Sequence, residues 1–366
     1  MSKKKICFIA QFPPPIHGLS KAVETLYNSE LNSNVNPDGE FEFEKVDITN
    51  NKNFLKNLVK ISKSKADLFY FTISQTKGGN VRDLVIFKLL ELQHKKCLIH
   101  LHGGYYRQLV DNDMAGWQKK ANYKAIKRID GAIVLGNSLK KIFYGMIDTV
   151  KIHIVPNCVD DEFVMGEEKF IKKQEELTLR KEKHVLFLSN MIRTKGYPTV
   201  LELAKEEKTR CNVGAEKKYH FDFCGKFFSD DERKFFDEYI KKNNLEEYVS
   251  YHGVVMGDEK RKFLAMADFF ALPTRYPNEG QPISIIEAMA NGLVIITTDH
   301  AGIPDLVKDG GNGIVQKQGE LLSIELLDNI EINSIAKQNR ETALTYYTEA
   351  KYIENMRDCF EKVTNR

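Results

Sequence analysis

Two glutamates separated by seven residues are the strongest candidates for chemistry in the sequence. Glu279 and Glu287 lie in the segment TRYPNEGQPISIIEAMANG. Residues 280–282 are typical of a turn and residues 283–291 of a helix, so Glu279 precedes the helix and Glu287 lies more than one turn inside it. A carboxylate at that position can accept hydrogen bonds from sugar hydroxyls, and the helix N-terminus can hold a phosphate. The plainer interpretation of Glu287 is an ordinary helix glutamate.

A second candidate site lies in the segment VLFLSNMIRTKGYPTVLELA, which has the pattern strand, loop, helix. Arg193 and Lys195 occupy the loop, and Gly196 precedes the helix. Arginine supplies a fork of donors, lysine a point charge, and the helix N-terminus a further attraction for anions. Together they predict a diphosphate site. The alternative is a solvated loop that carries two basic residues.

Two weaker candidates lie in the N-terminal half. In IAQFPPPIHGLSKAVETL a strand ends in a proline turn, and Gly18 would let the backbone approach a phosphate where a helix begins. The segment lacks the GxGxxG pattern, which disfavours a nicotinamide cofactor. In IHLHGGYYR, His102 could donate a hydrogen bond to a phosphate or a sugar hydroxyl. Each could equally be structural, as an ordinary strand-to-helix turn and a histidine bonded to backbone groups.

Short apolar runs that alternate with helical stretches must position these residues. The predicted strands are 4–11, 41–48, 67–74, 97–102, 131–136, 152–155, 184–189, 219–224, 248–251, 268–272, 293–297 and 313–316. The predicted helices include 19–31, 81–95, 118–129, 197–209, 230–243, 258–266, 283–291 and one near the end, 335–362. This alternation is typical of βαβ units and parallel sheets, so the fold class is α/β and doubly wound. Ligands of such sheets bind at the carboxyl ends of the strands.

The length of 366 residues predicts two domains. The break falls near 157–183, where turn residues are followed by a strongly charged stretch. We therefore expect an N-terminal domain at 1–160, a charged linker at 161–182 and a C-terminal domain at 183–345. We expect the final helix, 346–366, to pack back on the N-terminal domain.

Charge is distributed unevenly along the chain. Residues 1–157 hold 24 Lys and Arg against 14 Asp and Glu, a net charge of +10, whereas the rest of the chain holds 30 against 37, a net charge of −7. A basic half can meet an anionic substrate, an anionic membrane or nucleic acid, or can be only a solvated surface. No zinc finger, RRM or other nucleic-acid module occurs, so we expect no nucleic-acid partner.

The cysteines and the hydropathy predict a cytoplasmic protein. None of the six cysteines forms a CxxC pair, which indicates a reducing compartment and disfavours a structural zinc. No apolar run approaches the ~18 residues that span a bilayer, and the start of the chain does not resemble a signal peptide.

The motifs together resemble the retaining, nucleotide-sugar-dependent glycosyltransferases of family 4, of the bacterial polysaccharide and glycoconjugate type. The matching pieces occur in the order of that family: FLSNMIRTKG, FDFCGK, VSYHGVV, ADFFALPT, the two-glutamate segment and AGIPDLVKDGGNG. The N-terminal half adds the loop at 13–18, HLHGG and VPNCVD. The resemblance covers nearly the whole chain, and it is stronger in the second half. It implies a GT-B fold, in which two Rossmann-like domains face a deep cleft.

The resemblance also implies roles for individual residues. Arg193 and Lys195 would bind the donor diphosphate, Glu287 the ribose hydroxyls, and Glu279 the donor sugar as its bond to phosphate breaks. His102 would contact the sugar or a phosphate, which puts it with Glu279, Arg193 and Lys195 in the catalytic set. The remaining donor-binding positions implied by the family are Gly18, Gly225, Val254, Gly280, Gln281 and Ile283.

The family mechanism is hexosyl transfer with retention, with UDP as the expected nucleotide. No cofactor and no obligatory metal are implied, because basic residues and helix dipoles can offset the phosphate charge. Asp111-Asn112-Asp113 resembles a DxD metal motif, but chance is the preferred explanation. Two departures bear on the site: Pro282 lacks an N–H that other members can offer, and Cys158 replaces the glycine usual in NGVD.

The acceptor side is expected in the N-terminal domain. Residues 51–65 form a basic segment with apolar residues near one face, and residues 105–128 mix aromatic and basic residues. Residues 51–65 could rest on an anionic membrane surface. In residues 105–128 the aromatic side chains could stack on sugars and the cations could contact a lipid diphosphate. Either segment could also be an ordinary amphipathic helix of the domain. The net charge of the first half favours a saccharide acceptor that is linked to a lipid, and a protein that is peripheral on the inner face of the membrane.

Two other functions fit the same residues. One is a catalytically silent protein of this fold that binds a partner transferase. The other is an enzyme of different chemistry, such as a nucleotide-sugar epimerase, which would need no acceptor. The complete set of Arg193, Lys195, Glu279 and Glu287 and the segment EGQPISIIEAMANG favour a transferase.

Overall fold

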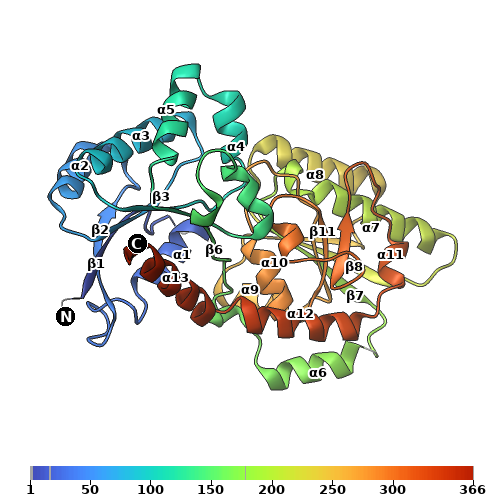
Figure 1. Ribbon diagram of the computed structural model, residues 1–366. Helices are drawn as coiled ribbons and strands as arrows, with labels where there is room; N and C mark the ends of the chain where they lie inside the picture. The colour runs from blue at the N-terminus through green and yellow to red at the C-terminus, as the bar shows by residue number, and fades with distance from the viewer. Residues whose placement is uncertain (1–2, 16–17, 178, 366) are drawn as a thin grey trace. The chain divides into compact units, whose positions relative to one another are not determined.

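The computed structural model of the protein describes residues 3–15, 18–177 and 179–365, and it divides the chain into two compact units (Figure 1). The first unit comprises residues 1–158 and 349–366, and the second comprises residues 159–348. The segment 161–182 contains helix α6 (Glu167–Leu177), which lies in the second unit. Phe170 and Leu177 of this helix are buried, and Lys173 Nζ donates to the carbonyl of Asn291 at 3.2 Å. Helix α6 therefore packs within a unit.

The first unit is built on a six-stranded parallel sheet with the order β2-β1-β3-β4-β5-β6. From β1 the chain adds β2 on one side and then returns to place β3 on the other side of β1. The carboxyl ends of β1 and β3 are therefore its topological switch point. The strands are β1 (Lys4–Ala10), β2 (Phe41–Asp47), β3 (Leu68–Thr72), β4 (Cys97–His100), β5 (Gly131–Val134) and β6 (Ile152–Ile154).

Helices cover this sheet, and the last helix of the chain is one of them. The helices are α1 (Gly18–Tyr27), α2 (Phe54–Lys63), α3 (Lys77–Leu92), α4 (Tyr106–Gln108), α5 (Gly116–Ile126) and α13 (Glu349–Thr364). Tyr352, Met356 and Phe360 of α13 are buried in the core of the first unit. The Phe360 ring lies 6.2 Å from Phe8 of β1, between ring centroids.

The second unit repeats the architecture with the strand order β12-β11-β10-β7-β8-β9, all parallel. Here β8 and β9 follow on one side of β7, and β10 returns to its other side. The switch point therefore lies between β7 and β10. The strands are β7 (Lys183–Leu188), β8 (Tyr219–Cys224), β9 (Val249–Gly253), β10 (Phe269–Leu272), β11 (Val294–Thr298) and β12 (Gly313–Gln316).

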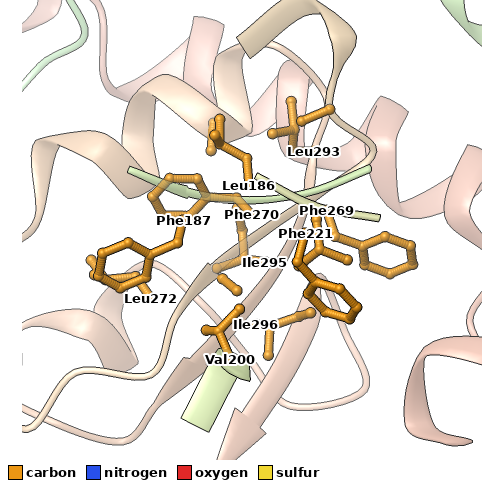
Figure 2. Packing of buried hydrophobic residues seen from close by; sticks show 14 of the residues in the cluster. Leu186, Phe187, Val200, Phe221, Phe269, Phe270, Leu272, Leu293, Ile295 and Ile296 are labelled. Atoms are coloured by element: carbon orange, nitrogen blue, oxygen red, sulfur yellow. The ribbon is translucent and has the colours of Figure 1, made fainter. Parts of the chain in front are cut away.

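Continuous apolar runs form the centre of this sheet because helices cover both of its faces. Figure 2 shows Leu186, Phe187, Phe270 and Ile295 from three neighbouring strands packed together. The surrounding helices are α6, α7 (Tyr197–Asn212), α8 (Asp230–Asn243), α9 (Gly257–Met266), α10 (Ile283–Ala290), α11 (Glu325–Asp328) and α12 (Ile332–Tyr346). All twelve predicted strands are confirmed, each to within two residues at its ends.

The C-terminal region differs from the single helix predicted over 335–362. It forms two helices, α12 and α13, which belong to different units. The buried residues of α12 include Ala336 and Ala343, whereas those of α13 begin at Tyr352. Nine residues at about 100° each separate Ala343 from Tyr352, so a continuous helix would place the two stripes on opposite faces. The break at residues 347–348 allows each stripe to reach its own core.

Candidate functional site

The loops that follow β7 and β10 meet at the switch point of the second sheet. The backbone N–H of Arg275 donates to the carbonyl of Thr194 at 2.7 Å. Gly196 has a φ of +92°, and a Cβ at this position would lie 2.3 Å from the carbonyl oxygen of Pro273. Only glycine allows this approach without strain. The close contact places the end of one loop beside the start of the other.

Lys195 and Glu279 form an ion pair between these two loops. Lys195 Nζ lies 2.6 Å from Glu279 Oε2, and the Thr274 hydroxyl donates to the same oxygen at 3.3 Å. The ammonium group also lies 4.8 Å from the ring centroid of Tyr276. Both charged side chains are mostly buried, with 15% and 9% of their surface exposed. The structure thus brings together two residues that are 84 positions apart in the sequence.

Two helices begin at this same edge. Helix α7 starts directly after Lys195 and Gly196, and α10 starts at Ile283 after the loop that carries Glu279. The first N–H groups of a helix point out of its N-terminus and attract anions, and they add to the charge of Lys195. Pro282 occupies the N-cap of α10, so the donors that α10 offers begin at Ile283. A cation and two helix N-termini can hold a diphosphate, and the Glu279 carboxylate can accept hydroxyl hydrogens.

Gly280 and Gln281 connect Glu279 to α10 and are buried. The carbonyl of Gly280 accepts a hydrogen bond of 2.8 Å from the backbone N–H of Gly302, in the loop after β11. His300 of that loop is bonded through Nε2 to the carbonyl of Tyr276 at 2.8 Å. A third loop therefore fixes the segment that carries Glu279.

Glu287 has a different partner. It lies on α10, is 4% exposed, and its Oε1 is 2.6 Å from Lys260 Nζ of α9. Burial raises the pKa of Glu287, and the nearby Lys260 ammonium opposes that shift. Lys260 in turn lies 3.9 Å from the ring centroid of Phe163. Glu287 is therefore a buried carboxylate held by a lysine that the sequence motifs did not identify.

Arg193 contacts α8 and is not paired with Glu279. Its Nε lies 3.2 Å from Glu232 Oε2, and its guanidinium carbon lies 4.5 Å from the ring centroid of Phe235. The side chain is 51% exposed. Glu232 also accepts a hydrogen bond from the Tyr197 hydroxyl. Arg193 is thus close to Lys195 in sequence, but its side chain belongs to a second small cluster.

Gly225 and Val254 follow β8 and β9 at the same edge of the sheet. A Cβ on Gly225 would lie 1.8 Å from the carbonyl oxygen of Ser189, so this loop contacts the loop after β7. Three apolar side chains near this edge are exposed: Val254 by 58%, Phe228 by 75% and Met256 by 67%. Gly225 therefore borders the loop that carries Arg193 and Lys195, and its N–H donates to the carbonyl of Gly253, the residue before Val254, at 2.7 Å.

The candidate residues of the first unit lie after β1 and β4. Gly18 is the first residue of α1, and residues 16 and 17 of its loop lie outside the described residues. His102 is half-buried, and its ring centroid is 3.9 Å from that of His100. His100 Nδ1 is hydrogen-bonded to the Tyr70 hydroxyl at 2.7 Å. Burial, with the adjacent His102, lowers the pKa of His100 well below its ordinary value, so it is neutral at neutral pH.

The residues of the described chain that could suggest a metal site have other partners or no metal-binding arrangement. Among residues 3–15, 18–177 and 179–365, no group of three or more His, Cys, Asp or Glu side chains is arranged to hold a metal ion. Asp111 of the DxD-like motif pairs with Arg107 and Lys119, and Asp113 accepts from the Tyr105 hydroxyl. The six cysteines are free thiols.

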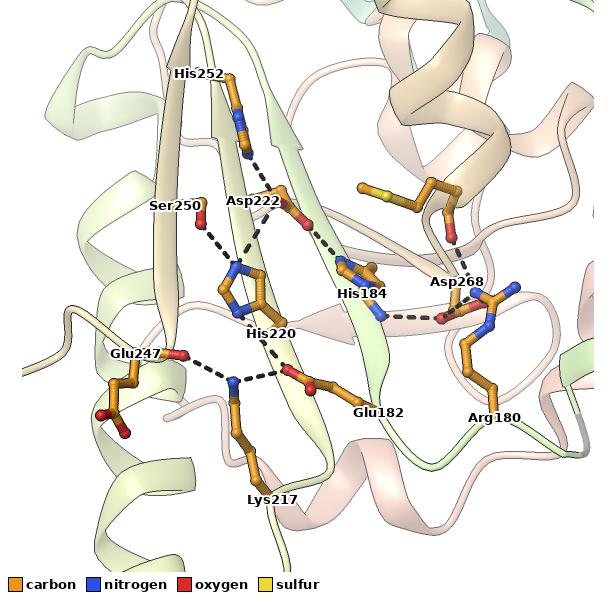
Figure 3. Close-up of polar contacts among 11 residues, drawn as sticks. Arg180, Glu182, His184, Lys217, His220, Asp222, Glu247, Ser250, His252 and Asp268 are labelled. Atoms are coloured by element: carbon orange, nitrogen blue, oxygen red, sulfur yellow. Dashed lines mark hydrogen bonds and ion pairs between the residues drawn. The ribbon is translucent and has the colours of Figure 1, made fainter.

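A polar cluster extends across β7, β8 and β9 (Figure 3). Asp222 lies at its centre, with Oδ2 2.7 Å from His184 Nδ1 and Oδ1 2.7 Å from His252 Nε2. The bond to Asp222 raises the pKa of His184. Although burial alone raises the pKa of Asp222, its two histidine partners hold it below the ordinary range. The cluster ties three strands together.

The comparisons with known proteins agree with this geometry. Residues 168–345 match the family model for glycosyl transferases group 1. This region, just under half of the chain, is a glycosyl transferases group 1 region. The matched region contains Lys195, Glu279 and Glu287, and it ends within helix α12.

Relatives of this glycosyltransferase extend the similarity toward the N-terminus. An uncharacterized 41.2 kDa protein in the cps region of Klebsiella pneumoniae is 27% identical over 290 residues, which cover 76% of this chain and 74% of that protein. An Escherichia coli UDP-Gal:alpha-D-GlcNAc-diphosphoundecaprenol alpha-1,3-galactosyltransferase is 22% identical over 282 residues, which cover 74% of this chain and 70% of that enzyme.

Solved structures share the fold of this glycosyltransferase over its full length. HepE of Anabaena, in complex with UDP, has a TM-score of 0.74 at 15% identity, and the match covers 98% of this chain and 100% of HepE. The lipopolysaccharide outer core galactosyltransferase WaaB matches with a TM-score of 0.66 at 14% identity, over 98% and 99% of the two chains. These matches confirm the predicted α/β GT-B fold. No helix within the described parts of the chain is long and apolar enough to cross a membrane.

Proposed function

We propose that the protein transfers a hexosyl group from a nucleotide diphosphate donor, with UDP as the nucleotide, to a saccharide hydroxyl during synthesis of a cell-surface polysaccharide. The observation that carries this proposal is the Lys195–Glu279 pair at the switch point of the second sheet, between the N-termini of α7 and α10. Lys195 and the helix amides suit the diphosphate, and Glu279 suits the hydroxyls of the donor sugar.

In this reaction the bond between the anomeric carbon and the phosphate oxygen breaks, and the acceptor oxygen bonds to the same carbon. The proton of the acceptor hydroxyl passes to the departing diphosphate. Negative charge accumulates on that diphosphate as the bond breaks, so Lys195 and the two helix N-termini would stabilise the transition state. We propose that they do so without an obligatory metal. Retention of anomeric configuration is part of the proposal because the family resemblance implies it.

The remaining candidate residues have the proposed roles that the family resemblance implies. Glu287, held by Lys260, would accept ribose hydroxyls, and Gly225 and Val254 would border the base. Gly18 and His102, at the carboxyl edge of the first sheet, would contact the diphosphate or the sugar. Arg193 would reach the diphosphate by leaving Glu232, since its side chain is half exposed.

The acceptor proposed is a saccharide linked to a lipid at the inner face of the membrane. The E. coli relative acts on a diphosphoundecaprenol-linked sugar, as its name states. The positive charge of the N-terminal half suits an anionic membrane surface. The name of a relative and the charge of the N-terminal half therefore support the same kind of acceptor independently.

Nucleotide binding tests the donor site. Thermal unfolding is measured with UDP, GDP, ADP and CMP for the wild type, Lys195→Ala and a matched control, Lys205→Ala. Lys205 is a half-exposed lysine of α7, paired on the surface with Glu202. A nucleotide at 100 times its Kd stabilises the native state by about 2.7 kcal/mol. We expect UDP to stabilise the wild type and the control but not Lys195→Ala. Equal stabilisation of all three proteins would place the nucleotide elsewhere.

A further inference from the structure

Three helices of the first unit turn large apolar side chains toward solvent. Leu55 of α2 is 76% exposed, Leu92 of α3 is 65% exposed, and Trp117 of α5 is 63% exposed. The same helices expose further apolar residues, namely Val59, Val81 and Val85. We call the surface formed by these six residues the α2–α3–α5 face. Apolar residues scattered singly over a surface are ordinary, but a contiguous group marks an interaction site.

The α2–α3–α5 face is hollowed by a groove of about 660 Å³ to which all three helices contribute. Its lining is mostly apolar, and it includes Val59, Val85 and Trp117. Helix α3 packs against both α2 and α5 (Figure 1). Five of the six exposed apolar residues line this one groove, namely Val59, Val81, Val85, Leu92 and Trp117. A second hollow, of about 580 Å³, shares Lys88 with the groove, and its lining includes Lys124 and Arg128 together with the acidic Glu91 and Asp130.

These exposed residues are not needed for the core of the first unit. Each helix already buries a separate set of side chains, including Ile61 of α2, Phe87 of α3 and Ile126 of α5. On α2, Phe54 and Leu58 are half-buried, whereas Leu55 and Val59 are exposed. Leu55 and Val59 are four residues apart and therefore lie on one outward stripe of the helix. An ordinary surface helix carries polar residues on that stripe.

Lys63 and Lys88 line the apolar groove, and the segments that contain α2 and α5 are rich in basic residues. The segment 51–65, which contains α2, holds five lysines and no acidic residue. The segment 116–128, which contains α5, holds four lysines and one arginine and again no acidic residue. Within α3, Glu91 is paired with Lys88 at 3.0 Å and with Arg128. The α2–α3–α5 face therefore combines apolar side chains with an excess of positive charge.

We propose that the α2–α3–α5 face is a docking surface for a bilayer that contains anionic phospholipids. Leucine, valine and tryptophan side chains enter the boundary between head groups and acyl chains, and the surrounding lysines contact lipid phosphates. Long lysine side chains can reach the phosphates while their stems lie on apolar surface. This proposal deepens the lipid-linked acceptor of the proposed function and rests on it for its biological purpose. Binding to vesicles is measured without donor or acceptor, so its failure is distinct from failure of the donor site.

The single tryptophan of the chain supplies the test, because Trp117 lies on the proposed surface. Fluorescence of the full-length protein is recorded with vesicles of phosphatidylcholine alone and with vesicles that contain 30 mol% phosphatidylglycerol. We expect a blue shift of the emission only with the anionic vesicles. Brominated acyl chains are expected to quench the signal, and 0.5 M salt to weaken binding, since exposed charges are screened.

Two variants locate the surface. Leu55→Glu combined with Leu92→Glu is expected to lower the vesicle partition coefficient at least about tenfold, because two anchors are lost and two negative charges gained. The matched control is Val150→Glu, at a residue of the first unit that is 64% exposed outside this face. It is expected to bind vesicles as the wild type does. Both variants change exposed residues, and circular dichroism checks that they are folded.

Three results would overturn the proposal. The first is an emission spectrum that does not change with anionic vesicles. The second is equal loss of vesicle binding in the double variant and in the control. The third is a blue shift that depends on protein concentration and not on lipid, which would assign the face to contact between copies of this chain.

Discussion

The two units share a topology, but their polar residues are arranged differently at the carboxyl edges of their sheets. In the second unit, Lys195 and Glu279 form a charged pair between two helix N-termini at the switch point. In the first unit, the edge carries a neutral, buried His100 bonded to Tyr70, with His102 beside it. The second unit therefore has the charges to bind an anionic donor. The distinctive surface of the first unit lies on its helices, where apolar and basic residues are exposed together.

This comparison indicates that two units, each built on a six-stranded parallel sheet, can carry different kinds of polar and apolar surface. A switch point supplies the position for a ligand, but the loops decide whether a charged ligand is held there. Substitutions in the second unit test how far donor binding and turnover depend on the Lys195–Glu279 pair.

The largest effect is expected from the charged pair itself. Lys195→Ala removes a cation from the developing charge of the diphosphate, and Glu279→Gln replaces the carboxylate that would contact the donor sugar. Loss of one such interaction in a transition state costs about 2.7–4 kcal/mol, or 10²–10³ in rate. Turnover is measured with a UDP-sugar and a lipid-linked acceptor. Wild-type turnover in both variants would contradict the proposed site, and Lys205→Ala serves as the control.

Glu287→Gln is expected to act on donor affinity. The substitution removes a buried carboxylate and leaves Lys260, 2.6 Å away, without its ion-pair partner. We expect KM for the donor to rise about tenfold, or about 1.4 kcal/mol, with a smaller change in kcat. Initial rates over a range of donor concentrations separate the two constants. A fall in kcat with KM unchanged would move Glu287 from the ribose to the reacting atoms.

Arg193→Ala is expected to have a smaller effect than Lys195→Ala. Arg193 is half exposed and pairs with Glu232, so it must leave this partner before it can reach a phosphate. We expect a few-fold loss in kcat/KM, since an exposed ion pair exchanged for another charge contact is worth about 1 kcal/mol. Glu232→Gln is the companion variant, and it should raise donor affinity slightly by freeing Arg193. Equal losses in Arg193→Ala and Lys195→Ala would show that both bind the diphosphate.

The smallest effect concerns stability and the polar cluster around Asp222. Its bond to Asp222 raises the pKa of His184, so the stabilisation is complete below about pH 6.5 and is lost as pH rises through the raised pKa. His184→Gln should therefore destabilise the protein by about 1 kcal/mol more at pH 5.5 than at pH 8.5. Urea unfolding followed by circular dichroism measures the difference.

The matched control for His184 is His94→Asn, at an exposed histidine with a φ of +52° that asparagine tolerates. This variant reports any dependence on pH that does not come from the Asp222 cluster. Burial lowers the pKa of His220, so this neighbour acts with the opposite sign: its contribution to stability falls as pH drops below about 6.5. A destabilisation by His184→Gln that does not depend on pH would contradict the assigned ion pair.

Much of the fold could be predicted because its strands are short, continuous apolar runs. The run FFAL of β10 is fully buried, and continuous apolar runs of this kind are typical of strands in a sheet that is covered on both faces. The break between α12 and α13 is harder to predict from the sequence. Both helices have a helical pattern, and only the phase of the buried residues shows that the buried face changes. The many charged residues of α6 favour the prediction of a linker at 161–182, although buried Phe170 and Leu177 pack the helix in the second unit.

The candidate site could be predicted only residue by residue. Lys195 and Glu279 each precede a helix, which indicated an anion site, but their contact depends on β7 and β10 being neighbours. Strand order follows from packing of the whole sheet and is not written in either segment. Lys260 and Glu232 carried no signal, because a charged residue on a helix is ordinary until its partner is known. The contact of Arg193 with Glu232 could not be predicted for the same reason, since the position of Arg193 in the sequence does not fix where its side chain points.

A crystal structure of the protein with UDP tests the donor site most directly. We predict that the diphosphate lies between the N-termini of α7 and α10, with Lys195 Nζ within about 3 Å of a phosphate oxygen, the range of a charge-assisted hydrogen bond. We also predict that Glu287 lies beside the ribose. A nucleotide bound away from the switch point of the second sheet, with the Lys195–Glu279 pair undisturbed, would contradict this site.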